Sequence, residues 1–202
     1  MSINELNSID VAGVVAVVCS VGYGIYQGFR RFYKKKFKKI DKFVVTHNNV
    51  HELLTELRLR TGANRATVFC LHNGGESIEG FSMRKFSASH ESCRRENSSQ
   101  INILTNCLCS LFAPVLKFVG DDNPKIIHIE ELQESFAKHF LKAEGVQWFA
   151  VLPVEKSGII TNFIMVQWQE IPQLHEENKE FENIFSNISA SIAVHLTQLS
   201  SK

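Results

Sequence analysis

The sequence lacks the cysteine patterns that mark disulfide-rich and zinc-binding proteins. Its 202 residues hold five cysteines and four prolines. No two cysteines form a Cys-x-x-Cys pair, and their spacing matches no zinc pattern. An odd number of cysteines, with Cys19 inside an apolar run, is typical of reduced, mostly buried thiols in a reducing compartment. We therefore expect no disulfide framework and no metal site.

The common catalytic motifs are absent as well. The chain has no Gly-x-Ser-x-Gly, no His-Glu-x-x-His and no phosphate-binding glycine loop. The spacing of residues in the sequence points to no nucleophile beside a base and to no pair of acid and base groups. The sequence therefore predicts no enzyme, no catalytic residue and no cofactor.

Charge is unevenly distributed along the chain. Residues 30–42 hold eight of the 22 basic residues and one of the 21 acidic ones, so the remainder carries a net charge of −6. A nucleic-acid-binding domain would spread its basic residues over a folded face. We therefore expect no nucleic-acid partner, and a mildly acidic body with one basic collar.

No charged residue occurs in residues 11–29, VAGVVAVVCSVGYGIYQGF. A helix of that length spans about 28 Å, close to the roughly 30 Å hydrocarbon core of a bilayer. The alternatives are a buried helix of a soluble protein and a cleaved signal peptide. The signal peptide is disfavoured because residues 1–10 lack lysine and arginine. The pattern therefore predicts a transmembrane helix at 11–29.

The basic collar follows this run directly. By the positive-inside rule, residues from 30 onward face the cytoplasm and the N-terminus faces out, in an inner or plasma membrane. We expect the collar to contact anionic lipid head groups through a set of seven side chains: Arg30, Arg31, Lys34, Lys35, Lys36, Lys38 and Lys39.

Small residues recur at every fourth position of the apolar run and end in a Gly-x-x-x-Gly pair. Such a stripe lets two helix backbones approach closely. We therefore expect a homo-oligomer, a dimer or larger, that packs through five residues: Ala12, Ala16, Ser20, Gly24 and Gly28.

A helical pattern continues beyond the collar to Gly62, which is a plausible helix C-cap. His47 and His51 lie four residues apart on this helix, a spacing that suits a metal ion. No third ligand accompanies them, so we interpret them as surface or interface histidines.

The remaining residues alternate between strand and helix patterns. Asn73-Gly74 is a hairpin turn signal. We expect an α+β fold around a five- or six-stranded, mostly antiparallel sheet. The expected strands are 65–72, 80–88, 125–130, 146–154 and 159–169, and the expected helices are 98–112, 131–144 and 175–199.

Two segments resemble the GAF domain, a relative of PAS. They read ELRLRTGANRATVFCLHNGG and EGVQWFAVLPVEKSGIITNFIMVQW, followed by a closing helix, and the resemblance covers about residues 50–200. The chain departs from the family at residues 160–162, where the family usually has a small residue. The resemblance implies a regulatory domain whose ligands are cyclic nucleotides or other small metabolites.

The residues whose side chains could bind a ligand or take part in catalysis lie around the first predicted hairpin. Cys70, His72, Asn73, His90 and Glu91 are the candidate ligand-binding set, because the two strand ends meet at one place. The alternative is that Asn-Gly-Gly forms the turn and the histidines cap strands near solvent.

The sequence thus predicts a membrane-anchored, non-catalytic regulatory or ligand-sensing module with a small-molecule or protein partner. The alternative is a phage-type oligomeric membrane protein, a holin-like lysis protein or virion component, whose soluble domain controls assembly. The expected parts are an outer tail (1–10), the membrane helix (11–29), a basic linker helix (30–60) and a GAF-like cytoplasmic domain (61–202).

Overall fold

A computed structural model describes residues 3–72, 84–120, 124–156, 159–172 and 179–200. The chain divides into two compact units, residues 1–45 (unit 1) and residues 46–202 (unit 2). The predicted Asn73-Gly74 turn lies outside the described residues.

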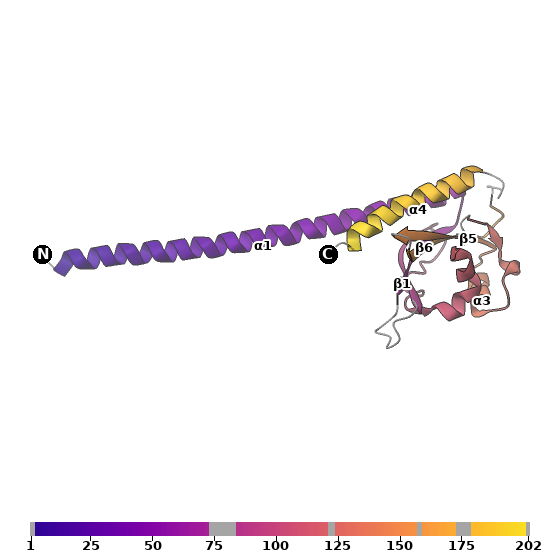
Figure 1. Cartoon of the computed structure of the whole chain (residues 1–202), viewed down its shortest axis with the longest axis horizontal. Helices are drawn as coiled ribbons and strands as arrows, with labels where there is room; N and C mark the ends of the chain where they lie inside the picture. Colours follow the sequence, from indigo (N-terminus) through magenta and orange to yellow (C-terminus); the bar gives the residue numbers. More distant parts are fainter. Residues whose placement is uncertain (1–2, 73–83, 121–123, 157–158, 173–178, 201–202) are drawn as a thin grey trace. The chain divides into compact units, whose positions relative to one another are not determined.

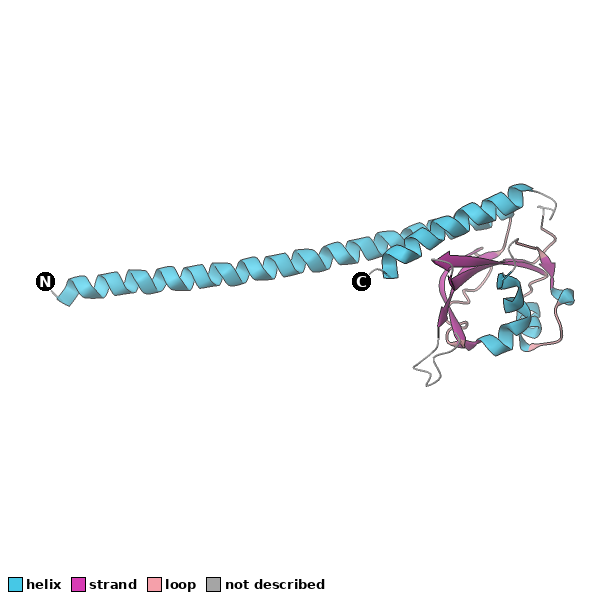
Figure 2. Ribbon diagram, in the orientation of Figure 1, coloured by secondary structure: helices cyan, strands magenta, loops and turns pink. Residues whose placement is uncertain are grey.

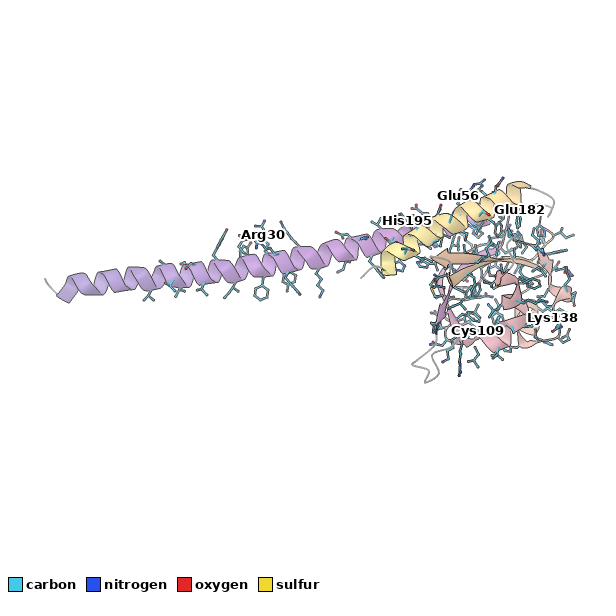
Figure 3. The ribbon with its side chains drawn as sticks, viewed as in Figure 1. Arg30, Glu56, Cys109, Lys138, Glu182 and His195 are labelled. Carbon is cyan, nitrogen blue, oxygen red and sulfur yellow. The ribbon has the colours of Figure 1, made fainter. Side chains whose placement is uncertain are left out.

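Unit 1 consists of the first part of helix α1, which runs from Ile3 to Thr61 without a break (Figure 1). From Gly13 onward its described side chains are almost all exposed, and Val18 retains 65% of its accessible surface. Arg30 projects from the same helix (Figure 3). An apolar helix with this much exposed surface is unusual in water, because exposed valines gain nothing from burial.

The structure does not support the predicted transmembrane helix. Within the described residues, no helical stretch combines the length and the apolar character that crossing a bilayer requires. Ser20, Gln27 and the tyrosines Tyr23 and Tyr26 interrupt the valine-rich run and lower its hydropathy.

Unit 2 is built on one six-stranded sheet in the order β3-β2-β1-β6-β5-β4, and all its described pairings are antiparallel. The predicted α+β class and antiparallel sheet are therefore confirmed. The strands are β1 (Arg65–His72), β2 (Lys85–Cys93), β3 (Cys107–Leu108), β4 (Ile127–His128), β5 (Trp148–Lys156) and β6 (Ile159–Trp168).

One face of the sheet is covered by the end of α1 and by helix α4 (Lys179–Ser200), as Figure 2 shows. Successive residues of a strand point to opposite faces, so Ala66 and Val68 of β1 face these helices. From α1 the core receives Val50, Leu54 and Leu57, spaced three and four residues apart on one helix face. The compact unit thus includes the last part of α1.

The opposite face is covered by short elements: the 3-10 helices η1 (Cys109–Phe112), η2 (Lys117–Gly120) and η3 (Ile129–Glu131), and the α-helices α2 (Ala113–Leu116) and α3 (Phe136–Ala143). Ser135 caps α3 by accepting a hydrogen bond from the Lys138 backbone N–H at 3.3 Å. Gly145, with a φ of 74°, ends this helical segment as the sequence predicted.

The predicted helix at 98–112 is wrong. Its residues form turns, then β3, then η1. Asn106 has a left-handed φ of 56°, which no α-helix contains, and the next two residues pair with β2. Apolar residues at helical spacing misled the prediction, because Leu104 is buried whereas Leu108 and Leu111 are exposed.

Two further boundaries differ from the sequence prediction. Strand β2 runs to Cys93, five residues beyond the predicted end, so it includes His90 and Glu91. Helix α3 begins at Phe136, five residues after the predicted start at residue 131, and 54% of the surface of Phe136 is exposed although its ring contacts those of Phe112 and Phe140.

Candidate functional site

Polar contacts join the end of α1 to the sheet of unit 2. Four of them join the helix to β2 and β6, and we call this set the α1–sheet interface. The contacts are His47–His90, Thr55–Ser92, Arg58–Ser92 and the Trp168 indole N–H to the Thr61 carbonyl. Because their helix positions share the face that carries the apolar core residues, the interface holds α1 by packing and by hydrogen bonds together.

His47 and His90 form the closest contact of this interface. His47 Nδ1 lies 2.6 Å from His90 Nε2, and the two rings are stacked with centroids 4.7 Å apart. The other nitrogen of His90, Nδ1, lies 3.0 Å from the Ser89 hydroxyl. Burial, followed by the charges of His47 and His51, lowers the pKa of His90 to about 4. His90 is therefore neutral at physiological pH.

Glu91 points to the opposite face of the sheet, where it meets Arg65. Arg65 Nε lies 3.0 Å from Glu91 Oε1, and each side chain retains only 3% of its exposure. These two atoms are close enough for an ion pair, but the Nε–H of Arg65 is not aligned for a hydrogen bond to the carboxylate. Glu91 also accepts hydrogen bonds from the Ser99 hydroxyl and the Gln100 backbone N–H, so it holds residues 99–100 against the sheet.

Arg65 has further partners around this buried pair. Its Nη1 donates to Gln167 Oε1 at 3.0 Å, and its Nη2 donates to the Ser98 carbonyl. Gln100 in turn donates from Nε2 to Glu144 at 2.7 Å. A buried charge with this many partners is a structural clamp between β1, β6 and the loop after β2.

Cys70 and His72 lie further along β1. His72 Nε2 is 2.8 Å from the Ser87 hydroxyl, which also accepts the Asn106 backbone N–H. Burial raises the pKa of the Cys70 thiol, so this cysteine is poorly suited to act as a nucleophile. Asn73 lies outside the described residues.

The candidate ligand-binding set is thus divided between two faces of the sheet. Cys70, His72 and His90 alternate onto the face of α1, whereas Glu91 faces the short helices. Among the described residues, none of these three side chains forms a hydrogen bond or an ion pair with Glu91. Sequence reasoning missed Arg65 altogether. It identified His47 as a surface or interface histidine but did not predict its contact with His90, because the two residues are distant in sequence.

The interior between the sheet and the short helices is filled by phenylalanine rings. Phe69 stacks on Phe163 at 4.9 Å, and Phe86 meets Phe112 edge-to-face at 5.0 Å. The cavity among these rings measures about 10 Å³, roughly the space for one water molecule. A metabolite would enter this space only if one or more rings moved.

Two open hollows are formed by described residues on the surface of unit 2. The larger, about 400 Å³, lies between β5 and α4, and its floor contains Pro153 with Ser189, whose hydroxyl donates to the Pro153 carbonyl at 2.7 Å. The smaller, about 180 Å³, lies beside Gly62, Arg94 and Glu170. Neither contains a member of the candidate set.

The remaining predicted residues lie in unit 1. Of the lipid-contacting set, Arg30, Arg31, Lys34 and Lys36 have described, exposed side chains. In the small-residue stripe, the Ser20 hydroxyl donates a hydrogen bond to the Ala16 carbonyl at 2.8 Å. A Cβ atom added at Gly24 or Gly28 would have no other atom within 4 Å. The described part of this stripe is thus open on the helix surface.

Metal and disulfide chemistry receive no support from the described side chains. Among them, no three His, Cys, Asp or Glu groups come together to hold a metal ion. The cysteines are free thiols, with Cys19 exposed and the other four half-buried. Half-burial does not match the mostly buried thiols that the sequence predicted.

Several solved structures are similar to this chain, and some of them are of GAF domains. The GAF domain region of a putative membrane protein from Geobacter sulfurreducens PCA aligns with 80% of this chain and 99% of its own, at a TM-score of 0.58 and 12% identity. The phycocyanobilin-bound GAF domain of a cyanobacterial phytochrome aligns with 81% of this chain and 92% of its own, at a TM-score of 0.58 and 14% identity. A domain of a putative two-component sensor histidine kinase from Sinorhizobium meliloti 1021 aligns with 76% of this chain and 92% of its own, at a TM-score of 0.53 and 11% identity.

These likenesses confirm the predicted GAF-like fold. At such low identity they show the fold and nothing finer. No family model and no curated protein matches the chain. The alternative prediction of a phage holin-like protein receives no support from these structures.

Proposed function

We propose that the protein is a non-catalytic regulatory module in which unit 2 responds to a small molecule or a protein partner and acts through α1. The observation that supports this most is that α1 supplies Val50, Leu54 and Leu57 to the core of unit 2. Any change that repacks this core therefore acts directly on the helix. The GAF-like fold adds support, since solved structures with this fold include a chromophore-bound domain and a sensor kinase domain.

The ligand branch of this proposal is tested by the thermal stability of the full chain in detergent micelles. A ligand present at a hundred times its Kd adds about 2.7 kcal/mol of stability. For a domain of this size, that corresponds to a rise in Tm of about 5–10 °C. We expect such a rise with a cyclic nucleotide or another small metabolite in a systematic screen.

The location of that ligand is tested with one variant and one control. If the ligand lies at the end of β1, His72→Ala abolishes the rise in Tm, whereas His128→Ala, on the far edge of the sheet, preserves it. A complete metabolite screen with no rise would exclude the ligand branch and leave a protein partner as the input.

We further propose that unit 1 anchors the protein to a membrane with anionic head groups. The support is the uncharged run 11–29, its exposed valines and the basic collar that follows it. Exposed apolar surface of this kind is stable in a lipid environment. If the helix inserts across the bilayer, the collar places unit 2 on the cytoplasmic side. Carbonate extraction of membranes measures this anchoring: protein that remains soluble without detergent would exclude it.

Self-association of α1 through its small residues is part of the same proposal. Gly24→Leu places a large side chain on the stripe, and we expect the dimer to weaken by about 10-fold or more, since overpacking costs about 1–3 kcal/mol. Gly22→Leu is the matched control, because Gly22 also has open space around it but lies off the stripe. Sedimentation equilibrium in micelles measures both. Equal dimer affinity in the two variants would contradict the assigned helix face.

A further inference from the structure

The His47–His90 contact depends on the charge of its two rings. A hydrogen bond between two imidazoles needs an N–H on one ring and a lone pair on the other. His47 Nδ1 and His90 Nε2 are 2.6 Å apart, so at least one of these rings must be neutral. If both rings were protonated, two positive charges and two N–H groups would face each other at this distance. The contact would then repel rather than hold.

The surroundings of His90 offer no easy compensation for a second charge. The residue retains only 8% of its accessible surface. On β2, Ser89 contributes a hydroxyl to His90 Nδ1, while Glu91 turns to the other face and is engaged by Arg65.

The elements that pack on this side of the sheet bring few titratable groups. Helix α1 contributes His51, whose charge acts on His90 in the same direction as that of His47, and Arg58, which donates to Ser92 two residues along β2 from His90. Strand β1 contributes the Cys70 thiol, whose pKa is raised by burial. On helix α4, the titratable side chains that the structure describes are those of Glu182 and His195 (Figure 3).

We propose that the His47–His90 contact is a proton-sensitive latch, which holds the end of α1 on the sheet while the pair is neutral or singly charged and releases it when both rings are charged. The inference rests on the proposed regulatory function, to which it adds the proton as an input. It places that input at the α1–sheet interface rather than in the phenylalanine-filled interior.

The direction of the pH response follows from the pKa of His90. Burial first, and then the charges of His47 and His51, lower that pKa to about 4 from an ordinary value near 6.5. Released or unfolded protein therefore binds a proton more readily than latched protein. The latch is fully effective above about pH 6.5 and weakens as the pH falls toward 4.

Hydrogen exchange in the full chain in detergent micelles tests the latch. The readout is the protection factor of the amides of residues 47–57, which corrects for the intrinsic pH dependence of exchange. From the two pKa values, we expect opening of this segment to increase about 30-fold between pH 7.5 and pH 5.0. In His47→Gln, which removes the charge of His47 but leaves the burial of His90, the increase should persist but be smaller than in the wild type. His139→Gln, an exposed histidine on α3, should behave like the wild type.

Two results would overturn the latch. One is a wild-type protection that is equal at both pH values. The other is a His47→Gln variant that responds as strongly as the wild type. If that variant does not fold, NMR titration of the wild-type imidazoles decides the question, because a His90 that titrates near 6.5 contradicts the proposal. Neither experiment contains a ligand, so a flat response removes the latch alone, whereas the metabolite and partner tests decide the regulatory function.

Discussion

Replacing Arg65 with methionine is expected to lower the free energy of unfolding by about 3–5 kcal/mol, the cost of leaving a buried charge without its partner. The substitution leaves Glu91, whose side chain is only 3% exposed, without its ion-pair partner. It also removes the hydrogen-bond donors to Gln167 and to the Ser98 carbonyl. Urea denaturation of the full chain in micelles, followed by the fluorescence of the buried Trp168, measures the loss as a lower midpoint.

Arg60→Met is the matched control for this prediction. Arg60 also pairs with a glutamate, Glu56, at 3.1 Å, but both side chains are about half exposed. An exposed pair of this i, i+4 kind contributes only about 0.3–0.5 kcal/mol. The double variant Arg65→Met, Glu91→Leu should recover part of the loss, because no charge is then left buried. Equal costs for Arg65→Met and Arg60→Met would show that the buried pair does not stabilise the fold.

Neutralising four residues of the basic collar is expected to weaken the preference for anionic vesicles by roughly 1000-fold. The change is Arg30, Arg31, Lys34 and Lys36 to glutamine. Each basic residue near an anionic surface contributes about 1 kcal/mol, so four contribute about 4 kcal/mol. The measurement is co-sedimentation with phosphatidylcholine vesicles, with and without phosphatidylserine, and the ratio of the two affinities removes the apolar contribution.

The control carries four neutralised charges in unit 2, at Arg60, Arg95, Lys117 and Lys142, all exposed. It should retain the preference for anionic vesicles. The preference should also fall as salt is raised, since the interaction with head groups is screened beyond about 10 Å at 0.1 M. A collar variant that still prefers anionic vesicles would contradict the lipid contact, whatever the rest of unit 1 does.

The sheet of unit 2 was largely predictable from the sequence, because its central strands carry their own signal. The predicted β1, β5 and β6 match the structure closely: β1 is 65–72 in both, and the last strand ends at Trp168 instead of residue 169. Apolar and β-branched residues on both faces of these strands leave little choice of conformation.

The contacts of the candidate site were not predictable from the sequence in the same way. Whether His90 faces α1 or the short helices depends on the register shift beside Val68 and Phe69, and no local pattern encodes that shift. The partner of Glu91 is Arg65, which lies at the start of the other strand of the pair. The turn at 98–106 was misread because Glu91 holds the backbone of Gln100, a tertiary contact that overrides the helical spacing of nearby apolar residues.

The two outer strands of the sheet, β3 and β4, have only two residues each. A long outer strand leaves a row of unsatisfied N–H and carbonyl groups, on which another chain can add a strand. Strands this short offer almost no such row, and β3 passes directly into a 3-10 helix. The two outermost strands themselves therefore give a neighbouring copy almost no backbone on which to add a strand. The row of backbone groups that they leave uncovered belongs to β2 beyond Phe86 and to β5 beyond Phe149, so that is where strand addition would have to occur.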